Sequence, residues 1–114
     1  MSRHNDDVSL RQMLDHAREA AALAQDLTRT TLEQDRIRLL ALLQLLQIIG
    51  EAARRVSEAR QLQLPQIQWP QIVGLRNRLV HGYDAVDYDT IWAILTSDLP
   101  ALVAELEKIV PPTA

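Results

Sequence analysis

Residues 37–49, IRLLALLQLLQII, decide the fold of this chain. Leucine and isoleucine occupy nearly every position around a helix here, and only one arginine, one alanine and two glutamines interrupt them. A helix that is apolar on almost all sides is buried on more than one side. The stretch is also shorter than the roughly 20 residues that cross a bilayer. We therefore predict that it lies in a central helix, from near Thr31 to about Arg60, around which the rest of the chain packs.

The composition agrees with an all-helical domain. The 114 residues are 47% hydrophobic and 24% charged, which is the balance of a globular chain that can build one core. There are 19 Leu and 14 Ala against only 3 Gly, so helix is favoured over turn-rich sandwiches and barrels. We expect a single domain over residues 1–114, with 1–7 as a mobile N-terminus. Its predicted class is all-α, an up-and-down bundle of four or five helices.

Several classes of function are excluded by what the sequence lacks. Cysteine is absent, which excludes disulfides, thiolate metal sites and a cysteine nucleophile. The first residues are acidic and lack the apolar stretch of a secretory signal, so we expect a cytoplasmic protein without membrane association. The net charge of −3 argues against a broad basic surface, so that any contact with RNA must be local.

Apolar residues at three- and four-residue spacing predict a first helix over about 8–28. Either Thr31 with Gln34 or Thr30 with Glu33 can then form the capping box of the central helix. These caps place the boundary between the two helices in a threonine-rich turn.

The same spacing predicts a last helix that packs on the central one. Asp87 or Asp89 can cap its start. Pro100 should kink or divide it, with Ser97 or Asp98 capping the second part.

Between the central and last helices we predict a connector over 61–69 and a short third helix from Pro70 to Gly82. Gly50 lies inside the central helix, where glycine costs about 1 kcal/mol relative to alanine. Close approach of another helix would compensate for that cost.

Residues 74–84, GLRNRLVHGYD, crowd two Arg, an Asn, a His and a Tyr at the end of the third helix. If that helix includes His81 in its last turn, Arg76 can reach towards it and Asn77 shares its face. The helix dipole and the aspartates that follow then favour a protonated imidazole, which can act as an acid or, when neutral, as a base. A structural role, in which His81 caps carbonyls and Tyr83 packs, fits the residues equally well.

The spacing Arg76-x4-His81, with Asn77 after the arginine and Gly82-Tyr83 after the histidine, resembles the signature of the HEPN superfamily. It is most similar to the Arg-x4-His-x-Tyr motif of the HepT-like branch. The likeness covers nearly the whole chain. Further blocks that look like this branch are IIGEAA at 48–53, WPQIVGLRN at 69–77 and DLP at 98–100.

This resemblance implies a homodimeric, all-helical ribonuclease toxin whose partner is a minimal nucleotidyltransferase antitoxin of the MntA type. In the family, the motif Arg and His form the RNase site in a cleft between two subunits, without metal or other cofactor. Carried over, the catalytic residues are Arg76 and His81, with Asn77 as the polar motif position. The family's motif tyrosine, to which the antitoxin attaches AMP, falls on Tyr83.

The chemistry of RNA cleavage without metal fits these residue types. It needs a base for the ribose 2′-OH, an acid for the leaving 5′ oxygen and a cation for the phosphorane charge. A two-fold dimer supplies His81 and Arg76 twice, which one chain cannot. Arg78 can add a phosphate contact or be a solvated helix residue. Glu51, on a polar stripe of the central helix, can pair with Arg76 and hold it, or be solvated.

Three other interpretations stay open. His81 with Asp84, Asp87 and Asp89 offers metal-binding side chains, but the loop matches no ligand spacing, and we expect no metal. The chain could instead be a non-catalytic helical module that grips a nucleotidyltransferase. It could also be a nucleotide-binding HEPN domain, which predicts ATP binding by the lone chain.

Overall fold

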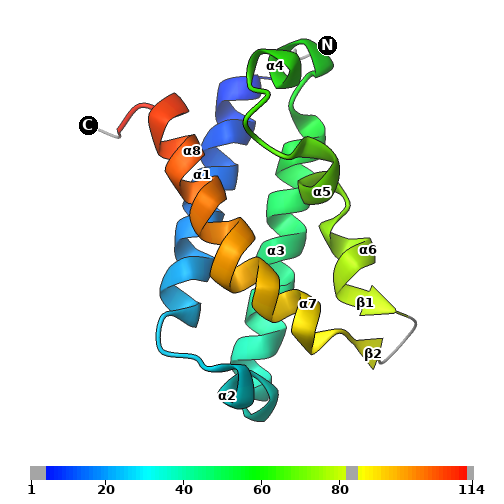
Figure 1. The fold of residues 1–114 in the computed structure, drawn as a ribbon. Coiled ribbons are helices and arrows are strands. Elements are labelled where there is room, and N and C mark those ends of the chain that lie inside the picture. The colour runs from blue at the N-terminus through cyan, green and yellow to red at the C-terminus, as the bar shows by residue number, and fades with distance from the viewer. Residues whose placement is uncertain (1–4, 82–84, 113–114) are drawn as a thin grey trace.

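Helix α3 (Arg36–Arg55) lies at the centre of the molecule, as its apolar run predicts. The computed structural model describes residues 5–81 and 85–112, and eight residues of α3 are buried in it. Helix α1 packs along one side of α3, while α5 and α6 lie against another (Figure 1). The prediction of a central helix buried on several sides is therefore confirmed.

The regular elements of the described residues are helices except for one small hairpin, which confirms the all-α class. The last helix is divided into α7, a π-helical turn η1 and α8, which run on from one another as one composite helix. In chain order, the other elements are α1 (Asp6–Ala24), α2 (Arg29–Gln34), α4 (Glu58–Gln63), α5 (Trp69–Val73), α6 (Leu75–Leu79), β1 (Val80–His81), β2 (Ala85–Val86), α7 (Tyr88–Ala93), η1 (Ile94–Asp98) and α8 (Leu99–Ile109).

Helix α1 begins inside the segment 1–7, which the sequence predicts as mobile. The Asn5 side chain caps it by accepting a hydrogen bond from the backbone N–H of Asp7 at 2.9 Å. The Asp6 carboxylate accepts hydrogen bonds from the backbone N–H and the hydroxyl of Ser57, at 2.9 and 2.7 Å. These contacts fasten the first turn of α1 to the turn that follows α3.

The capping box forms between Thr28 and Thr31, not between either pair that the sequence suggests. Each threonine hydroxyl accepts the backbone N–H of the other, at 2.7 and 3.1 Å. Helix α1 ends at Ala24, and the capping box begins a separate short helix, α2. Helix α3 then has its own cap, because Asp35 accepts the backbone N–H of Arg38 at 3.1 Å.

Helix α3 ends at Arg55 rather than near Arg60. Val56 is extended, with φ −68° and ψ 129°, and Ser57 caps α4 by accepting the backbone N–H of Arg60 at 3.2 Å. The predicted connector over 61–69 is correspondingly shorter, since α4 takes its first residues.

Gly50 confirms the predicted close approach of another helix. A Cβ at this position would lie 2.9 Å from the backbone carbonyl oxygen of Ile72 in α5. Glycine therefore lets α5 press directly on the central helix, and this contact positions the segment that follows α5.

Asp87 caps α7, as one of the two predicted caps, by accepting the backbone N–H of Thr90 at 3.0 Å. The division of this helix near Pro100 is also confirmed, but it takes the form of the π turn η1 and not of a new cap. The Asp98 side chain makes no capping hydrogen bond. Helix α8 packs mainly on α1, whereas the sequence predicts packing on the central helix (Figure 1).

Candidate functional site

Helix α6 carries the arginine of the motif and turns it outward. It starts directly after Gly74, whose carbonyl oxygen accepts the backbone N–H groups of Asn77 and Arg78 at 3.1 and 3.2 Å. Leu75 and Leu79 are only 4% and 2% exposed and bind α6 to the core. Arg76 and Asn77 are exposed. The burial pattern of this short helix therefore leaves both polar motif residues accessible.

Helix α6 ends at Leu79, three residues earlier than the predicted end at Gly82. The backbone of Val80 and His81 forms β1, which pairs antiparallel with β2 in the register Val80 to Val86 and His81 to Ala85. The carbonyl oxygen of Leu79 accepts the backbone N–H of Asp87 at 3.2 Å. The chain that returns from β2 thus donates a hydrogen bond to the last carbonyl group of α6, where the sequence predicts another helical turn.

The prediction that His81 occupies the last helical turn is therefore wrong, and Asn77 and His81 do not share a helix face. The His81 side chain and the whole of Tyr83 lie outside the described residues. What the structure fixes is the path of the backbone, which leaves α6 and enters a hairpin at the histidine.

Glu51 does not reach Arg76. Its carboxylate binds Arg54, at 3.0 Å, three residues along the same helix. Among the residues that the structure describes, Arg76 has neither an ion pair nor a side-chain hydrogen bond. The suggested Glu51–Arg76 pair is corrected accordingly: Glu51 binds a local partner, and no residue within 5–81 and 85–112 pairs with the guanidinium of Arg76.

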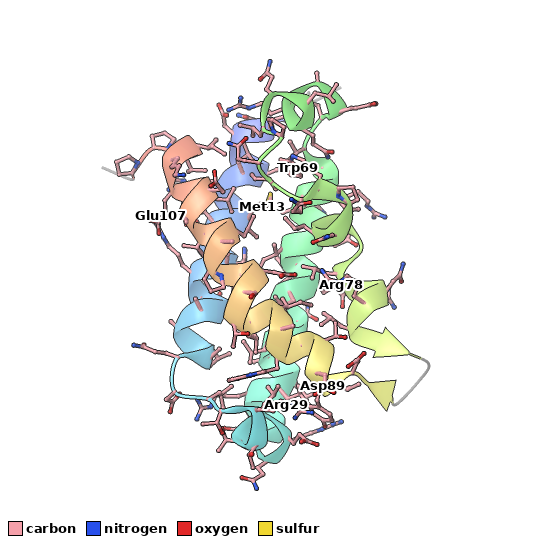
Figure 2. The ribbon with its side chains drawn as sticks, in the orientation of Figure 1. Met13, Arg29, Trp69, Arg78, Asp89 and Glu107 are labelled. Carbon is pink, nitrogen blue, oxygen red and sulfur yellow. The ribbon has the colours of Figure 1, made fainter. Side chains whose placement is uncertain are left out.

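Arg78 is half-buried and pairs with a carboxylate of the last helix. Its Nη2 lies 3.2 Å from Oδ2 of Asp98 in η1, and the two side chains are 35% and 39% exposed. Residues two apart on a helix lie roughly 160° from each other around the axis, so Arg78 and Arg76 point to different sides of α6. Figure 2 labels Arg78 on the side of α6 that borders the central helix.

The start of α7, on the other side of the hairpin, is held by α2. Arg29 binds Asp89 at 2.9 Å and lies 5.6 Å from the centre of the Tyr88 ring (Figure 2). The hydrogen bond to Asp89 raises the pKa of Arg29 above its usual value. Sequence reasoning missed this contact, because the two charges are far apart in the chain and neither belongs to a motif.

An apolar cavity of about 270 Å³ lies between α3, α5, η1 and α8. Its walls include Ile49, Leu75 and Leu102, and Arg78 and Asp98 also line it. Residues of the motif helix α6 and of η1 and α8 therefore line the same cavity, and the Arg78–Asp98 pair lies in its wall.

Two general properties of the described residues bear on function. They contain no group of three or more His, Asp or Glu side chains that could hold a metal ion. Of the side chains suggested for a metal, Asp87 caps α7 and Asp89 binds Arg29, while Asp84 and the His81 side chain are not described. None of the helices in the described ranges is long and apolar enough to cross a membrane.

The helical bundle, with the Arg-x4-His motif at a helix-to-hairpin junction, agrees with the resemblance of the sequence to the HEPN superfamily. The family described as "Ribonuclease HepT-like" matches residues 13–109. The chain therefore belongs to the HepT-like family, and the resemblance found in its motif blocks is confirmed.

Named relatives agree with this assignment. The chain is 30% identical over 109 residues to "Putative RNase MJ1380" of Methanocaldococcus jannaschii, covering 96% of this chain and 100% of that protein. It is 29% identical over 105 residues to "Probable ribonuclease HepT" of Thermococcus cleftensis, covering 89% of this chain and 96% of that protein. No solved structure matches the chain.

Proposed function

We propose that this protein is a metal-independent endoribonuclease, the toxin of a toxin–antitoxin pair, whose active site combines Arg76 and His81 from two subunits. The observation that carries the proposal is Arg76. It is the arginine of the family motif, it is exposed on α6, and no described residue neutralises it. Family membership supports cleavage of RNA at the level of the class.

Each group has one role in the proposed reaction. The neutral imidazole of His81 removes the proton of the ribose 2′-OH, and the resulting oxygen attacks the adjacent phosphorus. The guanidinium of Arg76 binds the two charged oxygens of the phosphorane, and the Asn77 amide donates a further hydrogen bond. The bond from phosphorus to the 5′ oxygen breaks, and the protonated His81 of the partner subunit gives that oxygen its proton. The products are a 2′,3′-cyclic phosphate and a free 5′-OH.

The need for both a base and an acid is the reason to propose a dimer. One histidine in each motif cannot be both base and acid in the same step, whereas two motifs facing one cleft supply both. Doubling Arg76 also provides a local positive site on a chain whose net charge is −3. The RNA contact is then confined to the cleft.

Regulation by the nucleotidyltransferase antitoxin fits the same place in the chain. AMP attached to Tyr83 would bring a phosphate two residues from His81, where it competes with RNA for Arg76 and fills the cleft. Replacement by phenylalanine, Tyr83→Phe, should leave ribonuclease activity intact and make it resistant to the antitoxin and ATP.

The test is cleavage of a defined RNA in excess EDTA by the protein and three variants. Arg76→Ala and His81→Ala should each lower the rate by about a hundredfold or more, because each removes a group that acts in the transition state. Arg18→Ala is the matched control, since Arg18 is 51% exposed and pairs with Glu107 on a different face. It should cleave like the unmodified protein.

Three results would overturn the proposal. Cleavage that EDTA abolishes would require a metal. No cleavage at any protein concentration, together with tight binding of the nucleotidyltransferase, would identify a non-catalytic partner module. ATP binding by the isolated chain without cleavage would identify a nucleotide-binding domain.

A further inference from the structure

The ion pair between Arg78 and Asp98 joins the motif helix to the π turn of the last helix. The 3.2 Å contact connects residues 20 positions apart in the chain, and both side chains are about two-thirds covered. From the sequence alone, Arg78 can add a phosphate contact or be a solvated helix residue. In the structure, the carboxylate of Asp98 binds the Arg78 guanidinium.

Pro100 explains why Asp98 is available for this contact. Proline has no N–H, and in a regular α-helix its ring would clash with the carbonyl group of Thr96. The chain instead widens into η1, in which the backbone N–H of Leu99 donates to the carbonyl oxygen of Ile94, five residues back. Asp98 therefore sits where a helix cap is expected, yet its carboxylate binds Arg78 and caps nothing.

Helix α6 needs such an external anchor. It has only five residues, and a helix of that length has no stability of its own in water. Leu75 and Leu79 fix its depth on the core. The hydrogen bond from Asp87 to the Leu79 carbonyl holds the end of the helix, and the ion pair at Arg78 adds a contact on a different side that resists rotation of α6.

We propose that Asp98 is a positioning residue. Through Arg78 it fixes the rotation of α6, and thus the direction in which Arg76 and the start of β1 face the RNA. The inference rests on the proposed ribonuclease function, and it removes Arg78 from the RNA-binding surface.

A double-mutant cycle tests the proposal. Asp98→Asn, Arg78→Gln and the double variant are compared for kcat and KM on the same RNA, at a temperature where circular dichroism shows each one folded. We expect each single change to lower kcat about fivefold with KM changed less than about twofold, and the double variant to be no slower than either single, because all three break one contact. The Arg18–Glu107 pair, at 3.4 Å and also between distant segments, gives the matched control cycle and should leave kcat unchanged.

Kinetic results of two kinds would overturn it. If Arg78 bound RNA, Arg78→Gln would raise KM, and Asp98→Asn, by freeing the guanidinium, would lower it. If the pair were only structural, the melting temperature would fall while kcat per folded molecule stayed constant.

Hydrogen exchange supplies a measurement that does not depend on cleavage. Backbone amides of residues 75–79 should exchange at least about fivefold faster in Asp98→Asn and Arg78→Gln, but not in Glu107→Gln. Unchanged exchange would overturn the inference by itself. An unmodified protein without ribonuclease activity would contradict the proposed function, and exchange would still decide whether the pair holds α6.

Discussion

Gly50 is the residue at which the backbone of α5 presses on the central helix. Adding a methyl group there would gain about 1 kcal/mol of helix propensity. The same methyl would lie 2.9 Å from the carbonyl oxygen of Ile72, which is backbone and cannot rotate away. We expect the clash to prevail, so that Gly50→Ala lowers the free energy of unfolding by about 1–3 kcal/mol.

Urea denaturation followed by circular dichroism checks this expectation. Ala22→Gly, at an exposed position of α1, reports the propensity difference alone and serves as the control. A Gly50→Ala protein more stable than the unmodified one would show that α5 can move away from α3 at no cost.

Single residues also show what sequence can predict about a site. The close approach at Gly50 can be predicted from the sequence, because a glycine within a helix is a local signal. The role of Arg76 in catalysis stays a prediction. The partners of charged residues cannot be predicted in this way. Glu51 binds Arg54 on its own helix, and Arg78 binds Asp98, which is 20 positions further along the chain. Charge identity says which residues can pair, but only the fold decides which ones meet.

At the scale of elements, the junction of α1, α2 and α3 depends on one arginine. Arg38 binds the carboxylates of Asp26 and Asp35, the latter at 2.8 Å. The hydrogen bond from the Arg38 side chain lowers the pKa of Asp26 below its usual 3.8, and hydrogen bonds from the Arg38 backbone and side chain do the same for Asp35. We therefore expect this junction to be sensitive to acid.

The sign of the effect follows from linkage. A carboxyl whose pKa is lower in the folded protein stabilises it above pH 3.8, and this contribution disappears as pH falls through the folded value. We therefore expect Arg38→Gln to be less stable than the unmodified protein at pH 7, and the difference to shrink below pH 3.8. Urea unfolding across pH 2–7 measures it. Arg36→Gln, one position from the Asp35 cap, is the control, and an equal deficit at every pH would contradict the assignment.

Elements differ in how well their sequence predicts them. Long helices such as α1 and α3 can be predicted from the sequence, because an apolar stripe of many residues has one clear period. The hairpin of β1 and β2 has two residues in each strand, too few to show alternation, so the sequence predicts a helix that continues to Gly82. Pro100 predicts a break in the last helix, but not that the break is a π turn, since that depends on whether the chain can widen in place.

At the scale of the whole molecule, the proposed mechanism needs two subunits in one active site. If base and acid are the two copies of His81, a dimer with one unmodified and one His81→Ala subunit lacks one of them and should be inactive. Co-refolding the unmodified chain with His81→Ala then gives a rate that follows the square of the unmodified fraction. At equal amounts about one quarter of the full rate should remain, against about one half if each subunit acts alone.

The matched mixture uses Arg18→Ala, which exchanges subunits in the same way and should keep the full rate at every ratio. Sedimentation equilibrium at the assay concentration establishes the mass of the particle. A linear dependence on the unmodified fraction, or a particle with the mass of one chain, would show that a single motif performs both proton transfers. The acid for the 5′ oxygen would then have to come from the same chain, and the composite cleft would be wrong.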